Sequence, residues 1–173
     1  GKKKADAQFL RAKEGDQTIR FLPAEDGDPF KDAYIHYGMG IPFLCPRRNF
    51  NEQCAICDYG FSLYKEGSEK NKALFKDLMP SHRFVGNVVV RGEEDVGPKV
   101  WVFGAKIYEQ LMTMLLDPDY SDITDPQTGR DFNLNYKPPQ GKGQYGAYAL
   151  TVKGKSSKLY KESEKEVEIL SKV

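Results

Sequence analysis

Residues 36–57 read HYGMGIPFLCPRRNFNEQCAIC and contain all three cysteines and one of the two histidines of this 173-residue chain. Cys54 and Cys57 have the Cys-x-x-Cys spacing of zinc knuckles, in which a tight turn directs two thiolates at one ion. Cys45 adds a third ligand, and His36, separated from it by eight residues, is the candidate for the fourth. The series predicts a closed Cys3His site that holds one structural Zn2+.

Two alternatives to this ligand set stay open. Buried free cysteines are common, so the three thiols could be ordinary core side chains, although their confinement to residues 45–57 favours a metal. His82 competes with His36, which is favoured because it is nearer in sequence and lies on a predicted strand that leads into the knuckle. No His-Glu-x-x-His helix and no His-x-Glu before a Pro-Cys-x-x-Cys is present, so catalytic zinc and enzyme activity are not expected.

Composition indicates a soluble globular protein. Hydrophobic residues make up 39% and charged residues 29% of the chain, and 26 Lys+Arg against 25 Asp+Glu leave a net charge of +1. No apolar run approaches the ~20 residues of a membrane span, and no signal peptide opens the chain. These features exclude a membrane-spanning class and predict a reducing cytosol and no membrane partner. The basic start, Gly1–Lys4, is expected to be disordered.

Alternating polar and apolar residues predict short strands over 18–22, 30–37, 83–91, 99–103, 132–137 and 148–153. In the first, Ile19 and either Phe21 or Leu22 should face inward and Arg20 outward. The apolar face of residues 105–116 predicts a helix. A polar helix is expected over 64–78, and a short terminal helix over 162–173.

This order of elements favours a mainly β fold with minor α. Five or six antiparallel strands with one central helix are typical of the Greek-key barrel of oligonucleotide-binding (OB) folds. The chain is therefore interpreted as one OB-fold core domain, residues 1–173, with a zinc-binding subdomain at approximately 36–78 inserted after the second strand.

Aromatic residues are the candidates for function, since the chain has 10 Tyr, 10 Phe and one Trp. Several adjoin Arg, Lys or Gly, as in Arg83-Phe84 and in Gln144–Tyr148. Unpaired bases stack on such rings for ~1–3 kcal/mol each, and nearby cations follow the phosphates. Phe21 and Phe103 are expected in the core because alternation points them inward, whereas Tyr145 and Tyr148 adjoin a Gly-rich loop and are better platforms.

The combination of motifs resembles a known family. The motifs are Ile19–Pro23, the His36 and cysteine series, Tyr59, Asn87–Val90 and Phe103-Gly104-x-Lys106-Ile107. Together they are similar to the core of the single-stranded DNA-binding (helix-destabilising, gene 32 type) proteins of T-even-type bacteriophages, from about Gln17 to Tyr148. The resemblance implies an OB-fold with an inserted zinc subdomain and DNA in the cleft between them. It also implies a role in phage DNA replication, recombination and repair in the host cytoplasm, with replication and recombination proteins of the same phage as partners.

Carried over by position, the resemblance implies DNA contacts from one arginine and five aromatic residues: Arg20, Tyr59, Phe84, Trp101, Tyr145 and Tyr148. Arg83 is also predicted to contact DNA, because a basic residue next to an aromatic one, here Phe84, suits binding of a single strand. The family has three basic residues before the aromatic that Phe84 replaces, whereas this chain reads Met79-Pro80-Ser81-His82-Arg83. Beyond Lys2–Lys4 the family's basic arm and its acidic tail are missing, so self-association is expected to be weak.

Two other function classes are weighed against single-stranded DNA binding. A zinc-ribbon protein-interaction module of a replication or transcription complex would use the same aromatic residues to contact a partner protein. A zinc-dependent nucleic-acid enzyme is disfavoured, because neither an open ligand position nor a general base can be identified.

Overall fold

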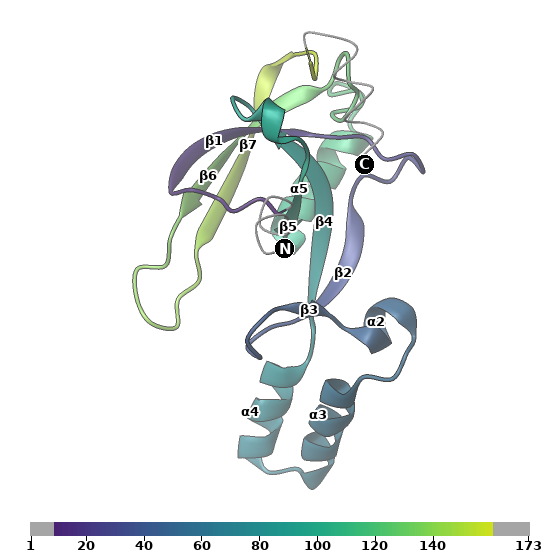
Figure 1. Cartoon of the computed structure of the whole chain (residues 1–173), viewed down its shortest axis with the longest axis vertical. Coiled ribbons are helices and arrows are strands. Elements are labelled where there is room, and N and C mark those ends of the chain that lie inside the picture. The colour runs from purple at the N-terminus through teal and green to yellow at the C-terminus, as the bar shows by residue number, and fades with distance from the viewer. Residues whose placement is uncertain (1–8, 161–173) are drawn as a thin grey trace. The chain divides into compact units, whose positions relative to one another are not determined.

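The structure is a computed structural model that describes residues 9–160 (Figure 1). The predicted basic start and the helix predicted over 162–173 lie outside the described residues. The chain divides into two compact units, one of residues up to Lys31 and from Val85 onward, the other of Asp32–Phe84. The insertion predicted at 36–78 falls inside the second unit. No helix within 9–160 is both long and apolar enough to cross a bilayer.

The first unit is built on antiparallel strands. It contains β1 (Gly15–Phe21), the second half of β4 (Ser81–Val90), β5 (Lys99–Phe103), β6 (Arg130–Lys137) and β7 (Ala147–Ser156). Their order is β4-β1-β6-β7, with β5 paired to β4. In the register, Ile19 of β1 faces Val90 on one side and Phe132 on the other. This arrangement confirms the mainly β fold class, while closure into an OB barrel stays a prediction.

The core of this unit is aromatic and β-branched. Ile19, Phe21 and Phe132 are fully buried, and the Phe21 ring meets those of Phe30 and Phe132 edge-on at centroid distances of 5.1 and 5.3 Å. Phe103 is buried as well, so the predicted core positions of Phe21 and Phe103 are confirmed. The helix α5 (Ala105–Leu116) has the predicted bounds, and a short 3-10 turn, η1 (Glu94–Val96), joins β4 to β5.

The second unit carries three helices. Here β2 (Lys31–His36) pairs with β3 (Phe43–Leu44) and with β4, and the helices are α2 (Pro46–Phe50), α3 (Ala55–Glu66) and α4 (Glu69–Leu78). The single helix predicted over 64–78 is wrong. Gly67 ends α3 in the left-handed region with φ 79°, and the Ser68 side chain caps α4 by accepting a hydrogen bond from Asn71 N. The two helices therefore form the hairpin that Figure 1 shows.

Gly129 occupies a position with no room for a side chain. A Cβ there would lie 2.5 Å from the Asp125 carbonyl oxygen and 2.6 Å from both Ile123 O and Arg20 Nη2. We expect Gly129→Ala to lower the free energy of unfolding by about 1–3 kcal/mol, because backbone atoms must shift to accept the methyl group. Urea unfolding measures this. Gly141→Ala is the control, since that position is open and should change stability by less than ~0.5 kcal/mol; equal stability of the two variants would contradict the packing argument.

Candidate functional site

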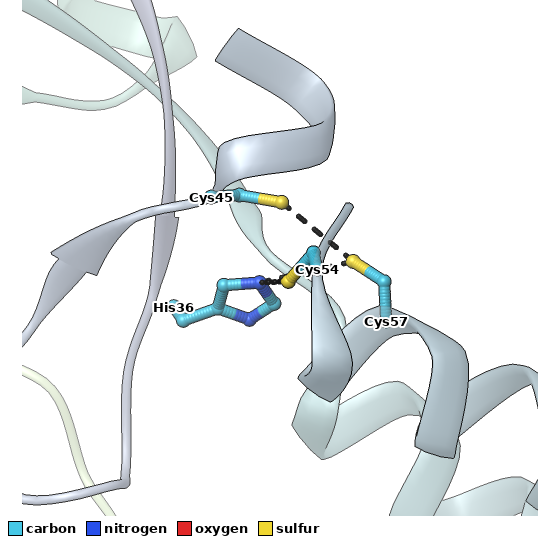
Figure 2. Close-up of side chains that lie close together, drawn as sticks. All are labelled: His36, Cys45, Cys54 and Cys57. Atoms are coloured by element: carbon cyan, nitrogen blue, oxygen red, sulfur yellow. Dashed lines mark hydrogen bonds between the residues drawn. The ribbon is translucent and has the colours of Figure 1, made fainter. Parts of the chain in front are cut away.

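Four side chains of the second unit converge on one point. His36 ends β2, Cys45 directly precedes α2, Cys54 directly precedes α3, and Cys57 lies in the first turn of α3. Figure 2 shows the four side chains close together. All four are buried. One ligand atom from each lies within 4.8 Å of all the others, so the cluster could hold one metal ion.

Three of the separations between these atoms fit tetrahedral coordination. Cys45 Sγ lies 3.6 Å from Cys57 Sγ, and His36 Nε2 lies 3.4 Å from Cys54 Sγ and 3.8 Å from Cys57 Sγ. Two thiolates bound at ~2.3 Å to one tetrahedral ion stand about 3.8 Å apart, and a thiolate and an imidazole nitrogen slightly closer. The three distances therefore match ligands that share one ion.

The ring of His36 is oriented by a bond that the sequence did not indicate. Its Nδ1 lies 2.9 Å from the carbonyl oxygen of Leu78, at the end of α4. A proton on Nδ1 donated to that carbonyl leaves the Nε2 lone pair directed at the cysteines, an arrangement common among histidine ligands. His82, the alternative, is exposed and has its Nε2 2.6 Å from Asp32 Oδ1. The cluster thus contains His36 and not His82.

The thiols differ in how readily they ionise. Burial and, after it, the neighbouring Cys45 and Cys54 thiols together raise the pKa of Cys57 to about 12. Burial also opposes ionisation of Cys54, but hydrogen bonds from the backbone of Cys57 and Ile56 and from the thiols of Cys57 and Cys45 outweigh it and lower its pKa. Three close thiols in a buried site resist losing all their protons, so a cation is the natural means of holding them as thiolates.

Three of the predicted DNA contacts are exposed rings. Tyr59 on α3 is 54% exposed, Tyr145 in the β6–β7 connection 94%, and Tyr148 at the start of β7 45%. The Tyr148 ring packs on Tyr136 of the neighbouring strand at 4.7 Å, which orients it. These rings offer surfaces on which bases can stack.

Two other predicted aromatic contacts are buried. Trp101 is 2% exposed, and its ring lies 4.9 Å from Phe103 and 6.0 Å from Phe21. Phe84 is also buried and packs against His82. A base could stack on either ring only after neighbouring side chains moved, so these two contacts stay predictions. Arg83, beside Phe84, is partly exposed.

The prediction that Arg20 faces outward is wrong, since its side chain is fully buried. Its guanidinium donates to Asp131 Oδ1, to the Ser157 hydroxyl and carbonyl, and to the Asp125 carbonyl. Burial lowers the pKa of Arg20, and the carboxylate of Asp131 acts against this, so the pair stays ionised. Arg20 therefore joins β1 to the segment after β7, and its predicted contact with DNA remains untested.

The structure also exposes apolar side chains that sequence reasoning passed over. They lie between His36 and Cys45, two residues of the cluster, and comprise Tyr37, Met39, Ile41, Phe43 and Leu44. Gly38 and Gly40 both have positive φ there, which keeps the segment out of a regular strand. The sequence signal that could have indicated these exposed side chains is the run of apolar residues over 37–44, which two glycines interrupt.

Comparison with known proteins identifies the family. The family model described as gp32 DNA binding protein like matches residues 13–173, nearly the whole chain. A comparison with curated proteins gave no match. The match extends across the metal-ligand series and all the exposed rings described above. The chain belongs to the gp32 DNA-binding protein-like family, as its sequence motifs predicted.

Proposed function

We propose that this protein binds single-stranded DNA without sequence preference and coats it reversibly, without catalysis, in phage DNA replication, recombination and repair in the host cytoplasm. Membership of a DNA-binding family supports the first part of this proposal. Replication and recombination proteins of the same phage are proposed as partners, and self-association is proposed to be weak.

The observation that carries single-strand binding is the exposure of Tyr145 and Tyr148. Two exposed rings in one hairpin offer apolar surface of the kind that interaction sites use. Duplex DNA keeps the faces of its bases stacked inside, whereas unpaired bases present their faces to any ring. Lys137 and Lys142, which are exposed and lie in the same hairpin, supply cations for the phosphates. Stacking together with unspecific charge contacts binds a strand regardless of its sequence.

We propose that the metal is a single structural Zn2+ held by His36, Cys45, Cys54 and Cys57. Three sulfur ligands and one imidazole in a tetrahedron are the donor set of structural zinc sites, and soft thiolates disfavour magnesium or calcium. With four protein ligands the site has no open position for water, so the ion would supply folding free energy rather than chemistry.

Removal of either exposed tyrosine is expected to weaken DNA binding. Tyr145→Ala and Tyr148→Ala should each raise the Kd for oligo(dT) by about 5- to 150-fold, because each ring contributes ~1–3 kcal/mol per stacked base. Fluorescence anisotropy of labelled oligo(dT) measures this, and it is preferable to tryptophan quenching because Trp101 is buried. Raising the salt concentration should weaken wild-type binding with a log–log slope near −0.7 per phosphate contact.

Tyr145→Phe is the matched control, because it keeps the ring and removes only the hydroxyl, so its Kd should stay close to that of the wild type. Duplex DNA of the same length should compete weakly with oligo(dT). Absence of binding to oligo(dT) at low salt would refute the proposal and favour a protein-interaction module.

A further inference from the structure

A stack of planar groups on the second unit ends in an exposed arginine. The Cζ of Arg48 lies 4.5 Å from the centre of the Tyr34 ring. Tyr34 stacks on His82 with 4.6 Å between centroids and 7° between planes, and His82 contacts Phe84 at 4.7 Å. Phe84 is buried, whereas Arg48 is exposed. His82 is exposed as well, but Arg48 is the exposed member that lies at the end of the stack.

Hydrogen bonds of the neighbouring Asn49 side chain hold the helix that carries Arg48 in place. Its neighbour Asn49 accepts a hydrogen bond from Tyr34 N at 3.0 Å and donates to Tyr34 O at 2.8 Å and to Cys45 O at 2.9 Å. The two bonds with Tyr34 tie α2 to β2 at the residue that carries the ring beneath Arg48, and the bond to Cys45 lies within the α2 segment. Tyr34 also packs against the cysteine cluster, so the platform is anchored to the metal centre.

Arg48 differs from the adjacent Arg47 in its partners. Arg47 forms an ion pair with Asp58, whereas Arg48 forms no ion pair with any acidic side chain of the described range 9–160. Its positive charge is thus held in place without a neutralising group. A guanidinium has two faces, and Tyr34 can cover only one of them. The other face is available to a second planar group.

We propose that Arg48 binds single-stranded DNA by stacking one unpaired base on the outer face of its guanidinium, in line with Tyr34. This proposal rests on the proposed function and adds a contact to it. Arginine planes accept bases as aromatic rings do, and the retained charge attracts the strand. The base is expected to add its ring to the existing series of Arg48, Tyr34 and His82. Phe84 is buried and cannot meet a base directly, so Arg48 would take its place as the exposed stacking surface.

Two substitutions and two strands separate stacking from charge. Arg48→Lys keeps the positive charge but removes the plane, and Arg48→Ala removes both. Each is measured against oligo(dT) and against an abasic strand of equal length, which has phosphates but no bases. We expect Arg48→Lys to raise the Kd for oligo(dT) about fivefold or more and to leave the Kd for the abasic strand unchanged. Arg48→Ala should show a larger loss on oligo(dT) than Arg48→Lys, because the charge is lost as well, and a smaller loss on the abasic strand.

Arg47→Lys is the matched control, because it lies in the same helix and lysine can keep the ion pair with Asp58; its Kd values should equal those of the wild type. Equal metal content and circular dichroism spectra confirm folding of every variant. The proposal is overturned if Arg48→Lys binds oligo(dT) as the wild type does, or if it weakens binding equally on both strands, since either result leaves no role for a base. Failure of the wild type to bind oligo(dT) would overturn the proposed function as a whole, a different result.

Discussion

Removing the metal is expected to unfold Asp32–Phe84 while the strands of the first unit persist. One buried cluster of this unit consists of the three cysteines with Tyr34, Ile56 and Met79 packed against them, so without an ion the segments that carry the ligands would lose the group that joins them. A structural zinc contributes ~10 kcal/mol or more of apparent binding free energy, which exceeds what so small a core supplies. Chelation should therefore abolish the helical signal of α2, α3 and α4 in circular dichroism.

Amide hydrogen exchange locates the loss. Exchange in the metal-free protein should be fast in α3 and α4 and remain slow in β1 and β6. Cys57→Ser should reproduce the effect and lower the metal content, while His82→Gln, which changes the only other histidine, should retain one ion per chain. Metal-free protein with unchanged helical signal and melting temperature would show that the four side chains are ordinary core residues.

Arg20→Met is expected to destabilise the first unit by about 3–5 kcal/mol. The substitution keeps a long side chain but removes the guanidinium, so Asp131 loses one of the positive charges beside it. The hydrogen bonds to Ser157 and to the Asp125 carbonyl are lost as well. Breaking one partner of a buried ion pair costs far more than the pair itself contributes, because the remaining charge stays buried. For a chain of this length the loss corresponds to roughly 6–20 °C in melting temperature.

Thermal unfolding and oligo(dT) binding together decide what Arg20 does. Arg91 also contacts Asp131, at 2.9 Å, so a residual fraction of the pairing survives in the variant. Arg83→Ala, at a partly exposed position, is the control for stability and should cost less than ~1 kcal/mol. Unchanged stability combined with weaker DNA binding in Arg20→Met would reverse the assignment and make Arg20 the DNA contact that the family resemblance implies.

Local patterns were enough to predict much of this protein. The Cys54-x-x-Cys57 spacing and its nearness to Cys45 and His36 identified the metal-ligand cluster, because a tight turn brings such ligands together whatever surrounds them. Period-two alternation located every described strand except β3, which has only two residues, and the apolar face of 105–116 located α5. The motif series also predicted the family that the comparison confirmed.

Tertiary structure decided which side chains are exposed. Arg20 is buried because Ser157, distant in sequence, folds over the outer side of β1, and no alternation within β1 could reveal that cover. Trp101 and Phe84 were predicted to stack on bases, yet the folded chain packs other rings on them. Whether a residue lies inside depends on segments that may be a hundred positions away, whereas turn spacing and strand periodicity are properties of neighbouring residues. For that reason the sequence by itself determined the residues of the cluster, the longer strands and the family, and only the folded chain decided which rings and cations can meet a ligand.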